Sequence, residues 1–193
     1  RREGKASDKA ILASRCIDRP IRRLFPKDMR NDVSVVATVM SVDPDCSPEI
    51  AALWGVSTAI AISDIPWDGP VSSVSLGLVD GKYVINPNLE ERAKTEMTVT
   101  VASTDSLVAM IEAGANEISN EVMFDGIKFA HEENKKVVEF IKGIAKEIGR
   151  EKIAFESNDP SEELYEAIKA FAIDDVKVAL DTDDKRIRDE RLQ

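Results

Sequence analysis

The chain has 193 residues, 43% of them hydrophobic, and a formal net charge of −10 at pH 7. This hydrophobic content can build a core for one domain with an appendage, which excludes a disordered polymer. The two cysteines, Cys16 and Cys46, have no further ligands at zinc spacing, and no apolar run approaches the roughly 18 residues of a membrane span, so we expect a cytoplasmic protein with reduced thiols and no membrane attachment.

The first predicted helix starts at Ser7, a typical N-cap residue, and ends where Pro20 interrupts it. Arg15, Arg19 and Arg22 follow one another at spacings of four and three residues. If the helical path continued past the proline, these three side chains would project from one side of the helix. The segment therefore predicts a stripe of guanidinium groups.

This stripe belongs to a basic end of an acidic chain. Residues 1–30 hold ten Lys and Arg against four Asp and Glu, a local net of +6, whereas residues 31–193 carry 16 basic and 32 acidic residues. Such a segment is typical of an anion-binding surface, because only concentrated positive charge overcomes the repulsion from the rest of the chain. A solvated helix face that is ion-paired to the chain's own acids is the alternative explanation.

The following segments predict a buried strand, a buried helix and a set of antiparallel strands. The run VSVVATVMSV at 33–42 is β-branched and continuous, which indicates a buried strand. Pro48 suits the first turn of a helix that is apolar nearly all round. Asp80-Gly81 and Thr104-Asp105 are hairpin signals between strands. The expected strands are 71–79, 82–87, 96–104 and 106–114.

A long helix is predicted after these strands. It starts at the N-cap Ser119 and reaches about Arg150, with a break or bend near His131. His131 is the only histidine, and neither a nucleophile nor a metal ligand lies one helical turn away from it. We therefore expect a structural role for His131 rather than a catalytic one.

The composition becomes charged and mostly polar after this helix. An amphipathic helix is expected at 161–180, and the residues after it begin another helix. The order of elements predicts an α+β fold in which helices pack on the faces of a sheet. We assign residues 1–152 to this sheet-and-helix domain and residues 153–193 to a partial all-α segment.

Four stretches resemble the bacterial polynucleotide phosphorylase family, and the resemblance extends over nearly the whole chain. The string IDRPIRRLFP is the most specific of them, whereas RREG alone would be weak. The stretches are RREG at 1–4, RCIDRPIRRLFP at 15–26, WGVSTAIAISDIPWDGP at 54–70 and HEE at 131–133.

The resemblance implies a fold and an activity. The fold is RNase PH-like, of the ribosomal protein S5 domain 2-like class: residues 1–152 match the first of two such cores, incomplete at its amino end, and residues 153–193 match the start of a helical linker domain. The activity is 3′-to-5′ phosphorolysis of RNA, which releases nucleoside diphosphates during mRNA turnover. Inorganic phosphate is the co-substrate, and Mg²⁺ or Mn²⁺ is bound outside this part of the enzyme.

The resemblance also implies partners and a binding surface. The partners are single-stranded RNA, the second core domain of the same chain, two further copies in a homotrimeric ring, and RNA degradosome components. Arg1 and Arg2 match an arginine pair that lines the RNA channel, and Arg15, Arg19 and Arg22 match positions associated with RNA or phosphate binding. Guanidinium groups at helical spacing suit a strand that is held by its phosphates without regard to sequence.

The chain departs from the pattern of the family's active second core, so we expect neither a catalytic nor a metal-binding residue in it. That core carries a Ser-Ser pair before the buried helix, where this chain has Pro48 and Glu49. It also carries Asp and Lys in an alternating strand, where this chain has Thr98 and Thr100. A carboxylate at the first place would repel phosphate, and the second place lacks the charges of phosphoryl transfer. The family's first core is likewise the non-catalytic one.

Two other functions remain compatible with the residues. One is a stand-alone RNA-binding or ring-scaffold protein that has the RNase PH fold and no catalytic partner domain. The other is an unrelated basic-face interaction module, which would bind heparin and RNA alike and lose affinity steeply as salt rises.

Overall fold

The structure is a computed structural model that describes residues 4–157 and 159–192. It divides into two compact units, the first ending at Phe155 and the second beginning at Glu156. The first unit holds four helices and four strands within the described part of the chain. They are α1 (Asp8–Arg22), α2 (Pro48–Ile62), β1 (Ser72–Val79), β2 (Lys82–Ile85), α3 (Leu89–Lys94), β3 (Met97–Ser103), β4 (Val108–Ala115) and α4 (Asn120–Ile148).

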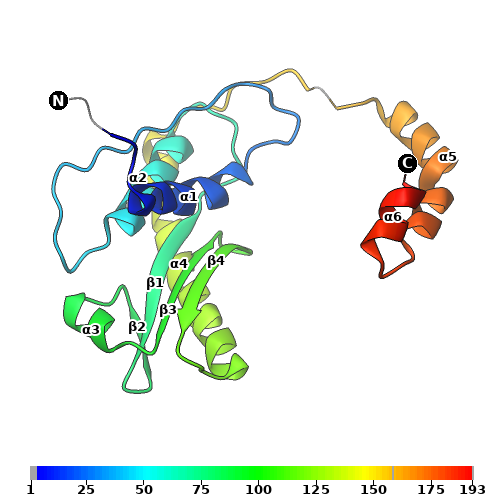
Figure 1. The fold of residues 1–193 in the computed structure, drawn as a ribbon. Helices are drawn as coiled ribbons and strands as arrows, with labels where there is room; N and C mark the ends of the chain where they lie inside the picture. Colours follow the sequence, from blue (N-terminus) through cyan, green and yellow to red (C-terminus); the bar gives the residue numbers. More distant parts are fainter. Residues whose placement is uncertain (1–3, 158, 193) are drawn as a thin grey trace. The chain divides into compact units, whose positions relative to one another are not determined.

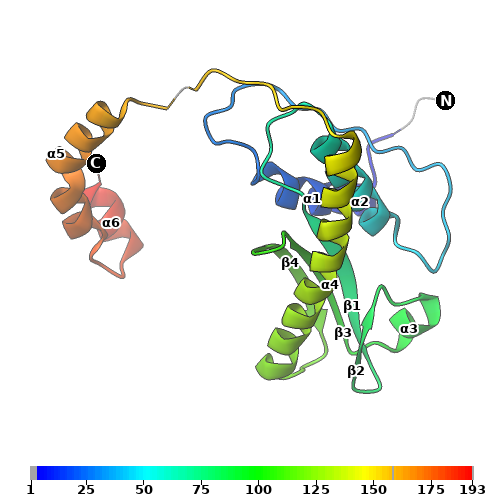
Figure 2. The same cartoon turned by 180° about the vertical axis from the view of Figure 1, so that it is seen from behind.

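The four strands form one antiparallel sheet in the order β2-β1-β3-β4. Helix α4 crosses one face of this sheet and continues past its end to pack against α2 (Figures 1 and 2). Helix α1 lies on the other side, where it contacts α2 and β4. The predicted α+β class is confirmed.

The face of the sheet under α4 is apolar. Val74, Leu76, Val99 and Val101 alternate with polar residues along β1 and β3, and each is at most 2% exposed. They pack against an apolar stripe of α4. Gly126 allows this close approach, because a Cβ atom at this position would lie 2.9 Å from Leu76 Cδ2. Burial of this face stabilises the unit, together with a second buried cluster around α1 and α2.

Helix α4 runs without interruption from Asn120 to Ile148, so the predicted break near His131 is wrong. His131 lies 2.9 Å from the Ser103 hydroxyl, measured from Nδ1. Asn134, fully buried one turn later, donates from Nδ2 to the carbonyl of Val101 at 2.9 Å. The polar residues that suggested a break are therefore accommodated by bonds to the sheet.

Helix α1 continues through Pro20, and the prediction that the proline ends it is wrong. The proline removes one backbone donor near the end of the helix, and its ring is less than 2% exposed. Ile21 is buried beside it in the cluster that joins α1 to α2. Packing of this end of α1 thus offsets the lost hydrogen bond.

The predicted buried strand at 33–42 is also wrong. These residues form no strand, and all of them are exposed. Among the described residues, none offers their backbone groups a hydrogen bond. A β-branched run becomes a strand only when a neighbouring strand pairs with it, and the four described strands do not include such a neighbour.

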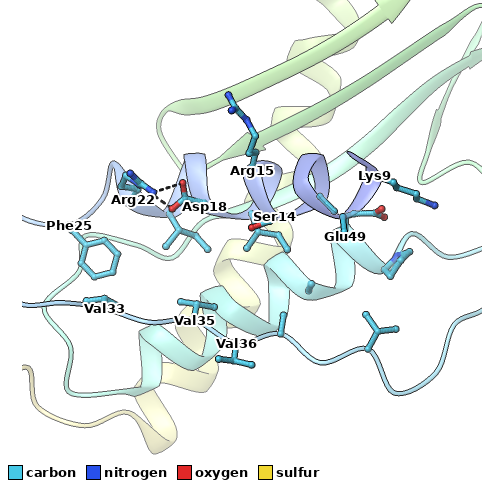
Figure 3. A pocket seen from close by; sticks show the side chains of 18 of the residues that line it. Lys9, Ser14, Arg15, Asp18, Arg22, Phe25, Val33, Val35, Val36 and Glu49 are labelled. Carbon is cyan, nitrogen blue, oxygen red and sulfur yellow. Dashed lines mark hydrogen bonds and ion pairs between the residues drawn. The ribbon is translucent and has the colours of Figure 1, made fainter. Parts of the chain in front are cut away.

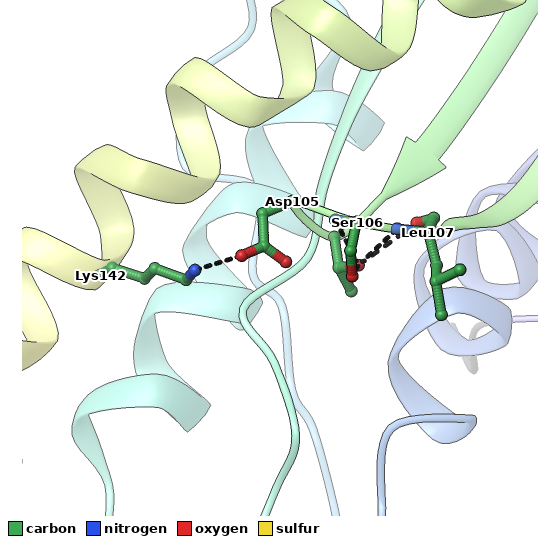
Figure 4. Close-up of polar contacts among 5 residues, drawn as sticks. Asp105, Ser106, Leu107 and Lys142 are labelled. Atoms are coloured by element: carbon green, nitrogen blue, oxygen red, sulfur yellow. Dashed lines mark hydrogen bonds and ion pairs between the residues drawn. The ribbon is translucent and has the colours of Figure 1, made fainter.

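The turn between β3 and β4 is tied to α4, as Figure 4 shows. Thr104 Oγ1 accepts from the backbone N–H groups of Ser106 and Leu107 at 3.3 and 3.0 Å. Lys142 of α4 donates to Asp105 Oδ2 at 2.5 Å. This hydrogen bond and ion pair lower the pKa of Asp105 and raise the pKa of Lys142.

The second unit contains α5 (Glu162–Leu180) and α6 (Lys185–Arg191). Ser161 caps α5 by accepting from Leu164 N, and Arg191 of α6 donates to the carbonyls of Val178 and Asp181.

No helix of the described chain is both long enough and apolar enough to cross a bilayer.

Candidate nucleic-acid interface

Helix α1 presents three arginines on one face. Ser7 begins the helix by accepting a hydrogen bond from Ala10 N at 3.2 Å. Because the helix continues to Arg22, residues Arg15, Arg19 and Arg22 fall within one sector of its circumference. All three side chains are exposed. We call these three residues the arginine face.

Two of the three guanidinium groups are ion-paired with the chain's own acids. Arg19 Nη1 lies 3.1 Å from Glu112 Oε2 on β4. Arg22 binds Asp18 one turn earlier through two nitrogens, at 3.0 and 2.8 Å. Within the described residues, Arg15 forms neither an ion pair nor a hydrogen bond. The arginine face therefore combines a free guanidinium with two paired ones.

These pairs do not close the surface to a phosphate strand. The side chains of Arg19 and Arg22 remain 43% and 76% exposed while paired. Exposed ion pairs contribute about 0.2–1 kcal/mol each, which a charge-assisted bond to a phosphate can replace. Arg19 also helps to hold α1 against the sheet, because its partner Glu112 lies on β4, the strand that α1 contacts.

An open groove of about 1200 Å³ borders α1, and Arg15 and Arg22 of the arginine face are among the residues that line it. Its walls are α1, the start of α2 and the extended segment that was predicted as a strand. Figure 3 shows Val33, Val35 and Val36 along this segment and Arg15 and Arg22 on α1. Two members of the arginine face therefore border a groove whose other wall is partly apolar.

The remaining predicted residues and two missed ones complete the surface. Arg1 and Arg2 lie outside the described residues. Lys9, which sequence reasoning did not single out, lines the groove from the first turn of α1. Arg23 donates to the carbonyl of Ala109 on β4 at 3.3 Å, so it helps to seat α1 on the sheet. Lys9 and Arg23 both belong to the basic segment at residues 1–30, and this local excess of positive charge was the only feature of the sequence that pointed to them.

The start of α2 carries a carboxylate where an anion could otherwise bind. Ser47 is the N-cap residue, and its hydroxyl donates to Glu49 Oε2 at 2.7 Å. Burial opposes ionisation of Glu49, yet the bonds from Ser47 and from its own backbone N–H, together with the charges of Lys9 and Arg92, hold the pKa of this carboxyl below its usual range. Glu49 is therefore a charged group at the positive end of the helix.

The described residues do not supply a metal site. No group of three or more His, Cys, Asp or Glu side chains in the described ranges could hold a metal ion. Thr98 and Thr100 occupy neighbouring positions of one face of β3, beside Ser75 and Gly77 of β1. Hydroxyl groups without carboxylates do not fit Mg²⁺ or Mn²⁺.

Two family models match most of the chain. The model described as "3′ exoribonuclease family, domain 1" matches residues 1–66, and that described as domain 2 of the same family matches residues 69–133. Trp67 and Asp68, between the two matches, donate to the carbonyls of Ile21 and Leu24 at 3.0 and 2.8 Å. These bonds tie the connection between the two matches to the end of α1, and both matches fall within one compact unit.

Curated relatives match the whole chain. It is 57% identical to a polyribonucleotide nucleotidyltransferase of Ruminiclostridium cellulolyticum and 54% identical to one of Clostridioides difficile, in each case over 192 residues. The chain spans 27% of the length of each of these relatives.

A solved structure supports the fold. Rice Rrp46 matches with a TM-score of 0.58 at 13% identity, over 75% of this chain and 69% of that one. At this identity the likeness concerns the fold alone, and it agrees with the RNase PH-like fold that the family matches indicate.

Proposed function

Because the chain belongs to the 3′ exoribonuclease family, we propose that it is the first RNase PH-like core of a polyribonucleotide nucleotidyltransferase, a phosphorolytic 3′-to-5′ exoribonuclease. In this proposal residues 1–152 form the core and residues 153–193 begin the helical linker domain. The core guides RNA and builds a homotrimeric ring in the cytoplasm. A second core of the same chain performs the chemistry.

The exposed arginine face is the observation that carries the RNA-guiding part of this proposal. Arg15 has no ion pair within the described residues, and the pairs of Arg19 and Arg22 are largely exposed. Guanidinium groups on one helix face bind successive phosphates through paired N–H donors. Arg1 and Arg2 extend the same function in the proposal, and degradosome components are its further partners.

Metal and phosphate chemistry belongs elsewhere in this proposal. The donors at the start of α2 and on β3 do not fit a divalent cation, so Mg²⁺ or Mn²⁺ would be held by the second core. Inorganic phosphate would bind there as co-substrate. We therefore expect the 193-residue chain alone to release no nucleoside diphosphate from poly(A) in the presence of phosphate and Mg²⁺, and phosphate-dependent release by it would overturn this part.

RNA binding by the arginine face is tested by removing its charges. The triple variant Arg15→Gln, Arg19→Gln, Arg22→Gln should bind single-stranded poly(A) about 100-fold more weakly than the unchanged chain at 0.1 M salt, because three phosphate contacts no longer release counterions. Fluorescence anisotropy of a labelled oligonucleotide measures the affinity.

The helix α4 offers a matched control. Lys128 and Lys136 are also exposed and Lys135 is half-buried, and all three are ion-paired, but they lie on the helix that covers the opposite face of the sheet. Changing these three to Gln alters the net charge equally and should reduce the affinity far less. Equal losses in the two triple variants would show a non-specific charge effect and would remove the proposed role of the arginine face.

A further inference from the structure

The strand β4 forms one edge of the sheet. The sheet order β2-β1-β3-β4 gives β4 a neighbour on only one side among the described strands (Figure 1). Helix α4 packs on β1 and β3 rather than on β4. Residues 111–115 of this strand are all exposed. The edge therefore offers both backbone groups and side chains to another strand.

The register of β3 and β4 decides which backbone groups of β4 point outward. Asn116 N donates to Glu96 O at 3.0 Å, which extends the β3–β4 register by one residue. Hydrogen-bonded pairs alternate along an antiparallel ladder, so from residue 110 onward the even-numbered residues of β4 direct their N–H and C=O groups toward β3. The backbone groups of Ile111, Ala113 and Ala115 point away from the sheet.

A hydrogen bond from α1 agrees with this alternation. Arg23 Nη1 donates to the carbonyl of Ala109, the odd-numbered residue before Ile111, at 3.3 Å. This outward carbonyl is therefore already occupied. Within the described residues, no turn or side-chain hydrogen bond uses the outward groups of Ile111, Ala113 or Ala115. We call these three residues the free edge.

The two edges of the sheet differ in how they are protected from pairing. Natural proteins protect edge strands by short length, proline or charged side chains. At the other edge, β2 has only four residues and begins with Lys82. In contrast, β4 has eight residues, and Glu112 is its one charged side chain. This carboxylate is held by Arg19 of α1 at 3.1 Å, so the free edge itself is apolar and mostly small.

We propose that the free edge binds β4 of a second copy of this chain, antiparallel and centred on Ala113. In this register Ala113 lies opposite itself, and Ile111 lies opposite Ala115 of the other copy. Their outward N–H and C=O groups then satisfy one another. On the side of the sheet that faces α1, Glu112 lies opposite Gly114 of the other copy, so each carboxylate has room and no like charge opposite it.

Charge and the bond from Arg23 select this register. A pairing centred on Glu112 would place the two carboxylates opposite each other, which is destabilising. A pairing centred on Ile111 would require the carbonyl of Ala109, which Arg23 already occupies. A twofold contact closes after two copies, so this inference goes beyond the proposed trimeric ring and does not depend on RNA binding.

The test is the oligomeric state of the 193-residue chain. Sedimentation equilibrium should show a reversible equilibrium between monomer and dimer. Ala113→Pro removes one outward N–H donor without removing a bond to β3, and should raise the dissociation constant of the dimer by about tenfold or more. Ala113→Lys keeps the donor and places two like charges opposite each other, so it should weaken the dimer even if the proline variant fails to fold.

Hydrogen exchange of individual amides locates the contact. The amides of Ile111, Ala113 and Ala115 should exchange more slowly as the protein concentration rises, whereas those of Glu112 and Gly114 should not change, because they are bonded to β3 in both states. Phe140→Lys is the matched control: it replaces an apolar side chain of α4 that is 70% exposed, and it should leave the dimer unchanged.

Three results would overturn the proposal. The first is a chain that stays monomeric or forms only trimers. The second is a dimer that persists unchanged in a folded Ala113 variant or is lost equally in Phe140→Lys. The third is slow exchange at the free edge that does not depend on concentration, which would mean that another segment of the same chain covers it.

Discussion

The two faces of the sheet carry different side chains although the same strands supply both. Under α4, Val74, Leu76, Val99 and Val101 form a buried apolar layer. On the other face, Ser73, Ser75 and Thr100 line a pocket of about 420 Å³ that lies beside α1 and the start of α2. Alternation along a strand therefore places apolar side chains under α4 and hydroxyl groups on the other face, the side on which α1 and its arginine face lie.

Substitutions at two neighbouring positions of β1, one on each face, should differ most in their effect on the free energy of unfolding. Leu76 is fully buried under α4, so Leu76→Ala should lower the free energy of unfolding by about 2–5 kcal/mol. Ser75→Ala, one residue earlier on the other face, should change it by about 0.5 kcal/mol or less. Urea denaturation followed by circular dichroism measures both, and equal losses would contradict the division of the faces.

Two serines on the α4 side should sharpen the same comparison. Ser72 and Ser103 are opposite each other in the β1–β3 register and both are fully buried. The Ser72 hydroxyl has no partner within the described residues, whereas Ser103 bonds His131. Ser72→Ala should therefore be neutral or raise the free energy of unfolding by up to about 1 kcal/mol, and Ser103→Ala should lower it by about 1 kcal/mol. The reverse order would show that an internal water or another group satisfies Ser72.

The smallest effect on stability is expected for Asp105, in the turn between β3 and β4. The bond from Lys142 lowers the pKa of Asp105, so this carboxylate contributes stability that is present above its unfolded pKa and is lost as pH falls through the lower folded value. The difference in melting temperature between the unchanged chain and Asp105→Asn should be small at pH 7, and should shrink in acid and at high salt. A difference that grows toward acid would contradict this sign.

Secondary structure could be predicted from the sequence where it depends on a local pattern. The alternation in EMTVTVAST and the N-cap at Ser119 predicted β3 and the start of α4, because these signals depend on nearby residues. Pro20 and the run at 33–42 were misread because their conformation depends on distant residues. Pro20 is buried at an end of α1 that packs on α2 through Ile21, and the run has no described strand beside it.

The candidate site was predictable in composition but not in contacts. Helical spacing identified Arg15, Arg19 and Arg22 as one face, and the structure confirms this arrangement. The pair between Arg19 and Glu112 joins residues that are 93 positions apart, so no local pattern could reveal it. The pocket between α1, α2 and the sheet likewise depends on a strand register that brings Ser75 beside Thr100.

The salt dependence of poly(A) binding tests most directly whether the arginine face holds an RNA backbone. The slope of log K against log salt concentration should be shallower by about 2 in the Arg15, Arg19 and Arg22 triple variant than in the unchanged chain, because three phosphate contacts to a single strand are lost. The α4 triple variant should keep the original slope. An unchanged slope in the arginine variant, with the fold intact by circular dichroism, would contradict the account.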